Sequence, residues 1–184
     1  IGGYPVAVKP AHGGSAMGVH RVDSVDELGE AILDALSFDE AVVVEQWVEG
    51  VEMAVSVLGT GWDAYALPPV EIVAKSGRYV TEARMTPGAV EYFAPVRPAS
   101  LAQDEADAQA IRAEIERAAL EVYRAYQVRD LARIDLIWDG AQARAFEVNV
   151  SPGMAEHSLF PTACAAAGLS LPKVLDSLVS QYAR

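Results

Sequence analysis

The stretch that decides the fold is Phe146-Glu147-Val148-Asn149-Val150-Ser151-Pro152-Gly153, read together with Arg133-Ile134-Asp135 upstream. Side chains two residues apart in a strand point to the same face of a sheet. Glu147 and Asn149 therefore share one face, and the apolar residues Phe146, Val148 and Val150 share the other. The upstream segment alternates in the same way, with polar Arg133 and Asp135 between the apolar residues Ile134, Leu136 and Trp138. The pattern predicts two strands, each with one buried and one polar face.

Asp139-Gly140, between these strands, is typical of a hairpin turn. Directly opposed residues share a face, so a two-residue loop here puts Asp135 and Glu147 on opposite faces. Only an odd-length loop, or a bulge, brings both apolar stripes to one side. We therefore predict a turn of three or five residues around Gly140, with the four polar side chains together on the other face.

Two carboxylates, an amide and an arginine on one face suit a hard cation that carries phosphates. Mg²⁺ takes oxygen ligands and is usually held by one or two carboxylates together with substrate phosphates. The alternative is the solvated polar face of an ordinary hairpin, and these four residues alone do not decide between the two.

Composition narrows the class of protein. The chain has 184 residues, 52% hydrophobic and 22% charged, which predicts one compact domain, in one or two lobes. A net charge of −12 argues against a general nucleic-acid or anionic-membrane surface. No apolar run reaches the roughly 18 to 20 residues of a membrane span.

Cys164 is the single cysteine and lies in an apolar run, which favours a buried structural thiol and a reducing compartment. The chain begins at Ile1 without a methionine, directly before a predicted strand. We therefore expect a fragment of a longer protein, with any targeting segment in the missing part.

A glycine-rich hairpin is predicted near the N-terminus. Strands at residues 4–10 and 19–22 flank Ala11-His12-Gly13-Gly14-Ser15-Ala16-Met17-Gly18, whose backbone N–H groups can approach phosphate oxygens. Lys9, at the end of the first strand, offers an ammonium group beside it. The segment is neither a Walker loop nor a dinucleotide fingerprint, because it has no Gly-Lys-Ser/Thr and no following helix start.

Ser24 and Glu27 form a capping-box pattern that opens a helix to about Leu36, with Ile32, Leu33 and Leu36 inward. Strands at 41–46 and 51–58 follow, joined by a polar connector at 47–50. The connector is either a hinge, where an adenine edge meets backbone groups, or a simple tight turn, and the pattern favours the turn.

Paired strands are predicted at 67–74 and 78–84, and residues 85–98 lack periodicity, as in a lid loop. A long amphipathic helix covers 102–126. After the hairpin come an alanine-rich helix and a last helix that opens at Leu171-Pro172. Its expected inward residues are Val174, Leu175, Leu178 and Val179.

An ordered set of short motifs runs along essentially the whole chain. The motifs are Val8-Lys9-Pro10, Gly14-Ser15, Gly18-Val19, Val44-Glu45, Glu49-Gly50-Val51-Glu52, Leu67-Pro68-Pro69-Val70-Glu71-Ile72, Thr86-Pro87-Gly88-Ala89, Arg133-Ile134-Asp135, Glu147-Val148-Asn149, Ser151-Pro152-Gly153-Met154 and His157-Ser158-Leu159. In this order and spacing the chain resembles the D-alanine:D-alanine ligases of the ATP-grasp superfamily.

The resemblance implies an α+β ATP-grasp fold, in which two α+β lobes hold a nucleotide between antiparallel sheets. Residues 1–50 correspond to the small lobe, with the glycine-rich hairpin, a helix and the hinge strand. Residues 51–184 correspond to the large C-terminal lobe with the metal site. The N-terminal domain of the family, which helps to bind the first D-alanine, is absent, so we expect the chain alone to bind nucleotide weakly and not to turn over.

The resemblance also implies the roles of the nucleotide residues. Lys9 contacts the ATP phosphates, and the hairpin with Gly14 and Ser15 folds over them. Glu45 meets the adenine amino group, Trp47 and Val48 line the hinge, and Glu52 holds the ribose hydroxyls. Arg84 corresponds to a lysine that contacts the transferred phosphate.

For the chemistry, the resemblance implies that Asp135, Glu147 and Asn149 bind two Mg²⁺ ions, with Mn²⁺ as a substitute. Arg133 and the backbone N–H of Gly153 stabilise the oxyanion of a tetrahedral intermediate. Ser158 and the N–H of Leu159 receive the carboxylate of the incoming D-alanine, and a helix N-terminus at Ser158 favours an anion independently. His157 is interpreted as a packing residue and not as a catalytic base.

Three departures from the family pattern affect the lid. Arg84 replaces a lysine, and a planar fork is not equivalent to an ammonium group. Gly13 replaces a common glutamate, and Met85 replaces a tyrosine whose hydrogen bond with Ser15 a thioether cannot make.

The leading hypothesis is ATP-dependent ligation of two D-alanines through an acyl phosphate, for peptidoglycan precursor synthesis in the cytoplasm. One alternative is a ligase of the same design with D-lactate, D-serine or another amino acid as second substrate. The other is a nucleotide-binding regulatory module without catalysis. The implied partners are ATP and D-alanine, with no nucleic acid or membrane, and the resemblance leaves room for a homodimer of the full-length protein.

Overall fold

The computed structural model describes residues 2–75, 86 and 88–183. These form two compact units, one of residues 2–49 with 73–75, 86 and 88–91, and the other of residues 50–72 with 92–183. One boundary between the units follows Glu49, next to the division predicted at residue 50, and the described residues of 73–91 group with the first unit. Helices and antiparallel strands occur together, as an α+β fold requires.

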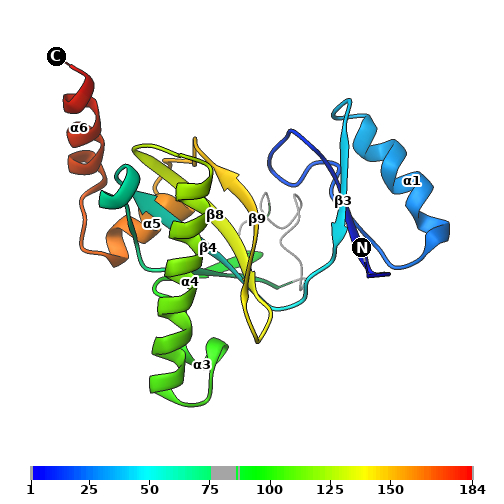
Figure 1. Cartoon of the computed structure of the whole chain (residues 1–184), viewed down its shortest axis with the longest axis horizontal. Coiled ribbons are helices and arrows are strands. Elements are labelled where there is room, and N and C mark those ends of the chain that lie inside the picture. Colours follow the sequence, from blue (N-terminus) through cyan, green and yellow to red (C-terminus); the bar gives the residue numbers. More distant parts are fainter. Residues whose placement is uncertain (1, 76–85, 87, 184) are drawn as a thin grey trace. The chain divides into compact units, whose positions relative to one another are not determined.

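The first unit contains a three-stranded antiparallel sheet in the order β2-β1-β3, and Figure 1 shows β3 with α1. Its elements are β1 (Val6–Pro10), β2 (His20–Val22), α1 (Val25–Leu36) and β3 (Val42–Gln46). Even-numbered residues of the strands, with Val8 at the centre, pack under Ala31 and Ala35 of α1. One face of this sheet is therefore closed by the helix, and the odd-numbered face is the polar one.

Helix α1 corrects two predictions. Leu33 and Leu36 are exposed, because the buried stripe passes through Leu28, Ala31, Ile32 and Ala35 instead. The predicted capping box is not formed. Ser24 is the N-cap residue but its side chain makes no capping hydrogen bond, and Glu27 accepts from the backbone N–H of Asp23.

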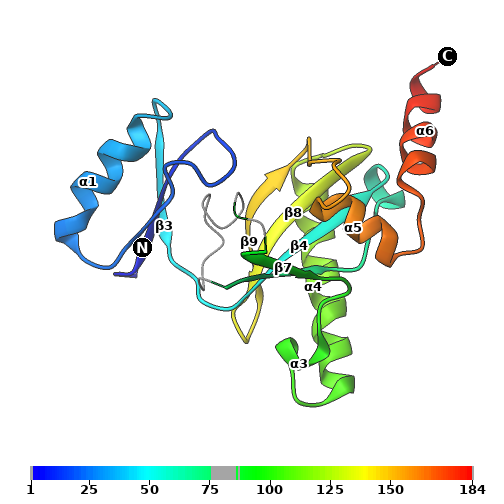
Figure 2. The same ribbon diagram turned by 180° about the vertical axis from the view of Figure 1, so that it is seen from behind.

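The second sheet follows the order β7-β6-β4-β8-β9, with β5 paired to β4 (Figure 2). Its strands are β4 (Val51–Leu58), β5 (Tyr65–Ala66), β6 (Val70–Ala74), β7 (Val90–Phe93), β8 (Leu131–Trp138) and β9 (Ala143–Asn149). The helical elements after β4 are η1 (Gly61–Asp63), α3 (Pro98–Leu101), α4 (Glu105–Ala125), α5 (Leu159–Ala166) and α6 (Leu171–Tyr182).

The main core lies between this sheet and α4, which Figure 1 shows along β4 and β8. Met53, Val55 and Val57 of β4 and the predicted apolar stripe of β8 are buried against Ile115 and Ala119. Tyr123 is also buried, and its hydroxyl donates to the carbonyl of Gly59 at 2.6 Å. Burial, with a smaller effect of the Asp130 charge, raises the pKa of Tyr123 to about 12.

The turn of the β8–β9 hairpin differs from the prediction. Trp138 pairs with Ala143, which leaves a four-residue loop, Asp139 to Gln142, so the predicted odd-length turn is wrong. A register shift between Asp135 and Leu136 inserts one extra residue instead. A bulge, the other solution that the alternation allowed, thus keeps Val148 opposite Ile134 on the core side, with Phe146 as the extra residue. Val150 follows the end of β9 and is 63% exposed, so it does not share that buried face.

The region predicted as an irregular loop, residues 85–98, contains strand β7 and the start of α3. The predicted strand at 78–84 lies outside the described residues. In α6, Val174, Leu175 and Leu178 are partly buried, but Val179 is 67% exposed, which corrects its inward placement.

Among the described helices, no single one is long and apolar enough to span a membrane. Helices α5 and α6 pass that test of length and composition only when taken together, with a bend of 103° between them.

Candidate functional site

The open face of the first sheet collects the predicted nucleotide residues. Arg21 pairs with Ala7, and Ala7 pairs with Glu45, so the three share one face in a row across the sheet. Lys9 follows two residues after Ala7 on the same face. Its ammonium lies 2.6 Å from the Glu45 carboxylate, and both side chains are partly exposed. The small side chain of Ala7 thus lies between the charged side chains of Arg21 and Glu45.

The Lys9–Glu45 pair joins two residues that the resemblance assigns to opposite ends of ATP. Both hydrogen-bonding groups point over the open face of the sheet. For Lys9 to bind a phosphate and Glu45 to bind an adenine amino group, their direct contact must be exchanged for contacts with the ligand.

The glycine-rich hairpin has an unusual backbone. Ser15 and Ala16 both adopt positive φ, at 57° and 58°, which non-glycine residues rarely do. Gly18 has φ 69°, and a Cβ there would lie 2.6 Å from the Phe38 ring, so only glycine fits. Gly14 and Ser15 are exposed, and a Cβ on Gly14 would meet nothing within 4 Å. Open space and backbone strain of this kind recur where loops approach ligands.

The root of this hairpin is held by a charged contact. The His12 backbone N–H donates to Asp39 Oδ2 at 2.6 Å, and the His12 ring Nδ1 lies 2.9 Å from the same oxygen. The His12 backbone hydrogen bond, with help from the His12 side chain, lowers the pKa of Asp39. The sequence did not single out this pair, because 27 residues separate its members.

The connector after β3 is also fixed in place. The Trp47 backbone N–H donates to the carbonyl of Pro5 at 3.1 Å, and its indole Nε1 donates to Glu49 Oε1 at 2.9 Å. Trp47 and Val48 are half-buried. Gly50 ends the connector with φ 156°, and a Cβ there would lie 2.1 Å from the carbonyl oxygen of Trp138. The backbone therefore requires glycine at position 50.

The polar face of the second sheet gathers the predicted catalytic residues. Asp135 lies directly opposite Glu147, and Arg133 lies directly opposite Asn149, as the alternation predicted. On the other side of β8, Ala54 faces Asp135 and Ser56 faces Arg133. Two parallel rows therefore cross the sheet, one through Asp135 and one through Arg133.

Arg133 and Asp135 form a buried bidentate pair. The guanidinium Nε and Nη2 donate to the two carboxylate oxygens, each at 2.7 Å, and the two residues are 6% and 7% exposed. Arg133 Nη2 also lies 3.9 Å from Glu147 Oε1. One arginine thus faces both carboxylates, which is the charge balance that a buried carboxylate needs.

These residues fit a divalent cation with phosphates. The set offers two carboxylates and an amide oxygen, which are ligands of the type that Mg²⁺ prefers. Asn149 Oδ1 accepts from the Ser151 backbone N–H at 3.0 Å, which fixes the amide at the end of β9. In the part of the chain that the structure describes, no group of three or more His, Cys, Asp and Glu residues is placed to hold a metal. Three such oxygen ligands would be part of a coordination shell and not a closed cage.

Glu52 lies on β4 and is partly buried. It shares the face of Ala54 and Ser56, as residues two and four further along a strand do. Ser56 is fully buried, and its hydroxyl has no hydrogen-bond partner among the described residues. Ser56 lies directly opposite Arg133, and its hydroxyl oxygen is closed to solvent.

The segment after β9 brings Gly153, Ser158 and Leu159 together. A Cβ on Gly153 would lie 3.1 Å from Ser158 Oγ, so glycine permits their close approach. Ser158 is the N-cap residue of α5 and its side chain makes no capping hydrogen bond. Leu159 is the first residue of that helix, where backbone N–H groups point out of the helix end. A carboxylate is favoured at such a position.

Two predicted residues, Arg84 and Met85, lie outside the described residues.

The sequence analysis did not predict a buried carboxylate, Glu71, which is 3% exposed. It accepts hydrogen bonds from Ser100 and from the backbone N–H, Nε and Nη2 of Arg97, at 2.7 to 3.2 Å. Burial alone would raise the pKa of Glu71, but these hydrogen bonds outweigh it and lower the pKa. Its signals were a charged residue in an apolar strand and its place in the family motif at 67–72.

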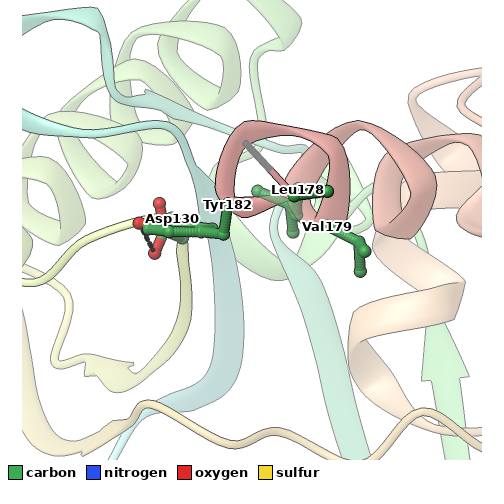
Figure 3. Close-up of a pocket in the computed structure, with 5 residues that line it drawn as sticks. Asp130, Leu178, Val179 and Tyr182 are labelled. Atoms are coloured by element: carbon green, nitrogen blue, oxygen red, sulfur yellow. Dashed lines mark hydrogen bonds between the residues drawn. The ribbon is translucent and has the colours of Figure 1, made fainter.

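The structure also has an open apolar hollow of about 380 Å³ next to α6. Figure 3 shows Tyr182 pointing to Asp130, with Leu178 and Val179 on the same helix. The Tyr182 hydroxyl donates to Asp130 Oδ2 at 2.8 Å. This hydrogen bond raises the pKa of Tyr182, and burial and the Asp130 charge add to the effect. None of the predicted site residues lines the hollow.

The sequence of residues 2–180 matches a family described as "D-ala D-ala ligase C-terminus". The chain belongs to this family. A D-alanine–D-alanine ligase from Bordetella petrii is 39% identical over 183 residues, which cover 98% of this chain and 53% of that protein. The D-alanine–D-alanine ligase from Alcanivorax borkumensis is 40% identical over 167 residues, which cover 90% of this chain and 50% of that protein.

Solved structures agree with the family and its ATP-grasp fold. The VanG D-Ala:D-Ser ligase from Enterococcus faecalis has a TM-score of 0.80 and 29% identity, over 98% of this chain and 50% of that chain. The D-alanine–D-alanine ligase from Bacillus anthracis, complexed with ATP, has a TM-score of 0.74 and 26% identity, over 97% of this chain and 52% of that chain. The chain spans about half the length of the curated relatives that it matches.

Proposed function

We propose that this chain is the catalytic part of an ATP-dependent ligase that joins two D-alanines through an acyl phosphate, for peptidoglycan precursor synthesis in the cytoplasm. The observation that supports it most directly is the β8–β9 register, which gathers Arg133, Asp135, Glu147 and Asn149 on one polar face in a member of this family. The D-alanine–D-alanine ligase relatives and the ATP-complexed structure from Bacillus anthracis support ATP and D-alanine as its substrates.

In this proposal the residues of the first unit bind ATP. Lys9 leaves Glu45 to neutralise phosphate oxygens, and the exposed backbone around Gly14 and Ser15 donates N–H groups to the same phosphates. Glu45 and the connector with Trp47 and Val48 receive the adenine. Glu52 accepts from the ribose hydroxyls.

Asp135, Glu147 and Asn149 hold two Mg²⁺ ions in this proposal, or Mn²⁺ in their place. When bound, such ions would supply positive charge that neutralises the phosphates during transfer to the carboxylate of the first D-alanine. The chain's own contribution is to fix three oxygen ligands on a rigid hairpin. Asp135 is oriented by Arg133, and Asn149 is oriented by the Ser151 N–H.

The ligation step needs stabilisation of a developing oxyanion when the amine of the second D-alanine attacks the acyl phosphate. Arg133 and the backbone N–H of Gly153 donate to that oxygen. Ser158 and the N–H of Leu159 hold the carboxylate of the attacking D-alanine at the start of α5. Arg84 contacts the transferred phosphate, and Ser15 closes over it. Catalysis in this scheme is positioning and charge neutralisation.

The proposal has alternatives for the identity of the second substrate. VanG is a D-Ala:D-Ser ligase, and its structure is as similar to this chain as those of the D-alanine–D-alanine ligases. D-Serine is therefore the leading alternative, ahead of D-lactate and other amino acids. A regulatory nucleotide-binding module is less well supported, because binding ATP alone requires neither Arg133 nor Ser158.

The proposal assigns the nucleotide-holding small lobe to residues 1–50 and the metal-binding lobe to residues 51–184, with the family's N-terminal domain supplying further contacts to the first D-alanine. A homodimer of the full-length protein is compatible with it, and no nucleic acid or membrane takes part.

The test is ATP-dependent phosphate release by the full-length protein with Mg²⁺, D-alanine and a panel of second substrates. We expect release with D-alanine alone and its loss in Glu147→Ala. Release only with a mixed pair would move the assignment to the D-serine or D-lactate alternative. Binding of ATP without any release would favour the regulatory module.

A further inference from the structure

Arg21 is a charged residue on the open face of the first sheet to which none of the steps above gives a role. It lies on edge strand β2, and its side chain is only 25% exposed. Its Nε donates to Asp23 Oδ1 at 2.9 Å, and its Nη1 donates to Glu49 Oε1. The guanidinium also lies over the Trp47 ring, 5.4 Å from the ring centroid.

Trp47 and Arg21 converge on the same acceptor. Glu49 Oε1 receives the indole N–H of Trp47 at 2.9 Å as well as the arginine Nη1. The three side chains therefore form a closed set of contacts: ring to guanidinium, guanidinium to carboxylate and carboxylate to ring N–H. An isolated exposed ion pair contributes little, but a network that also stacks on an aromatic ring restricts that ring's orientation.

The sheet is built so that Arg21 can reach this far. Strand β1 lies between β2 and β3, so the side chain of Arg21 must cross β1 to reach the connector after β3. The residue directly opposite Arg21 on β1 is Ala7, whose methyl group leaves room above the strand. An arginine suits the task because its planar fork can donate in its plane while its face stacks on an indole, which an ammonium group cannot do.

We propose that Arg21 is a positioning residue for the base-binding end of the nucleotide site: by holding Trp47 and Glu49, it fixes the connector that receives the adenine. This inference rests on the proposed function, because it takes the 47–50 connector as the adenine contact. Arg21 touches neither phosphates nor reacting atoms in this role. Its loss should therefore weaken recognition of the base and leave recognition of the triphosphate intact.

The experiment compares the full-length wild-type protein with Arg21→Met, Arg21→Lys and the charge-matched control Arg117→Met, whose arginine pairs with Glu121 on the exposed face of α4. Dissociation constants are measured for ATP and for inorganic tripolyphosphate, both with Mg²⁺. The protein is labelled with 5-fluorotryptophan, and the Trp47 resonance is assigned from Trp47→Phe. Thermal unfolding of each variant checks that it is folded.

We expect Arg21→Met to raise the Kd for ATP about three- to tenfold and to leave the Kd for tripolyphosphate within about twofold. The ¹⁹F resonance of Trp47 should shift while those of Trp62 and Trp138 stay in place, and Arg117→Met should change nothing. Arg21→Lys should be intermediate for ATP, since it keeps the charge but loses the fork.

Equal weakening of ATP and tripolyphosphate would overturn the inference, because it would make Arg21 a general electrostatic contributor. Unchanged ATP binding in both Arg21 variants would overturn it as well. If the wild-type protein bound no ATP while Arg21→Met still shifted the Trp47 resonance, the proposed function would fail and the positioning of Trp47 by Arg21 would stand.

Discussion

The two sheets carry their charges in different environments. On the first sheet, Lys9 and Glu45 are paired at 22% and 38% side-chain exposure, so water can replace either partner. On the second, the Arg133 and Asp135 side chains are 8% and 10% exposed, so neither charge can be left alone cheaply. The comparison teaches that the buried Arg133–Asp135 pair depends on its own partners in the folded protein. The Lys9–Glu45 pair, in contrast, can exchange its contact for contacts with a ligand.

The largest expected effect is at Arg133. Arg133→Met removes both hydrogen bonds to the buried Asp135 carboxylate and should lower the free energy of unfolding by about 3–5 kcal/mol. Urea denaturation measures this, and turnover should fall at least about a hundredfold if Arg133 serves the oxyanion. The control Arg117→Met, on the exposed face of α4, should change stability by less than about 0.5 kcal/mol. A loss below about 1 kcal/mol at Arg133 would remove the contrast between the two sheets.

A similar but smaller effect is expected at Glu71, because its partner Arg97 is 45% exposed and can be solvated. Glu71→Gln should lower the free energy of unfolding by about 1–3 kcal/mol. A lowered pKa in the folded state means that Glu71 stabilises the fold above the ordinary carboxyl pKa of about 4.3, and that this contribution is lost as pH falls through the lowered value. Wild-type stability should therefore fall more steeply than that of Glu71→Gln below about pH 4.3. Parallel acid profiles from chemical denaturation would contradict this.

For the first sheet we expect the opposite balance at Lys9. Lys9→Met should change the free energy of unfolding by no more than about 1 kcal/mol, since the pair it breaks is half solvated. Binding of both ATP and tripolyphosphate should nevertheless weaken, because the variant lacks the ammonium group. Calorimetric titration and urea denaturation of the same samples measure the two quantities. A large loss of stability with unchanged binding would reverse the comparison.

The smallest effect is expected at Ser56, and its sign is informative. If the buried hydroxyl has no partner, Ser56→Ala should leave stability unchanged or raise it by up to about 1 kcal/mol. Because the hydroxyl is closed to solvent, the same change should leave the KM of each substrate unchanged. Destabilisation by Ser56→Ala would indicate a partner for the hydroxyl in the folded protein.

The faces of the strands could be predicted from the sequence, because the two-residue period of a strand assigns each side chain to a side. This is why Asp135 lies opposite Glu147 as expected. The four-residue turn could not be predicted, because a bulge adds a residue at a position that alternation does not mark. The outward Leu33 on α1 was also missed, since an apolar side chain on a helix does not show which side is covered.

The charged contacts were the least predictable part of the candidate site. Glu71 and Arg97 are 26 residues apart, and Arg21 and Glu49 are 28 apart, so nothing local in the sequence joins them. The predicted roles of Lys9, Glu45 and Ser158 came from their family resemblance, and their contacts with ATP and D-alanine stay predictions. Apart from the resemblance, the sequence was informative through the periodicity of its apolar residues. This periodicity does not show which charged residues, distant in the sequence, contact one another.

The single cysteine of this chain, Cys164, is fully buried in α5, and burial raises the pKa of its thiol. A thiol reagent can modify it only when the region around α5 opens, so its labelling rate measures the population of open molecules. Because α5 begins at the predicted carboxylate-binding residues, protection of Cys164 by D-alanine or its analogues would report ligand binding without any turnover. The labelling rate of Cys164 can therefore report how often the region around α5 opens, with and without a ligand.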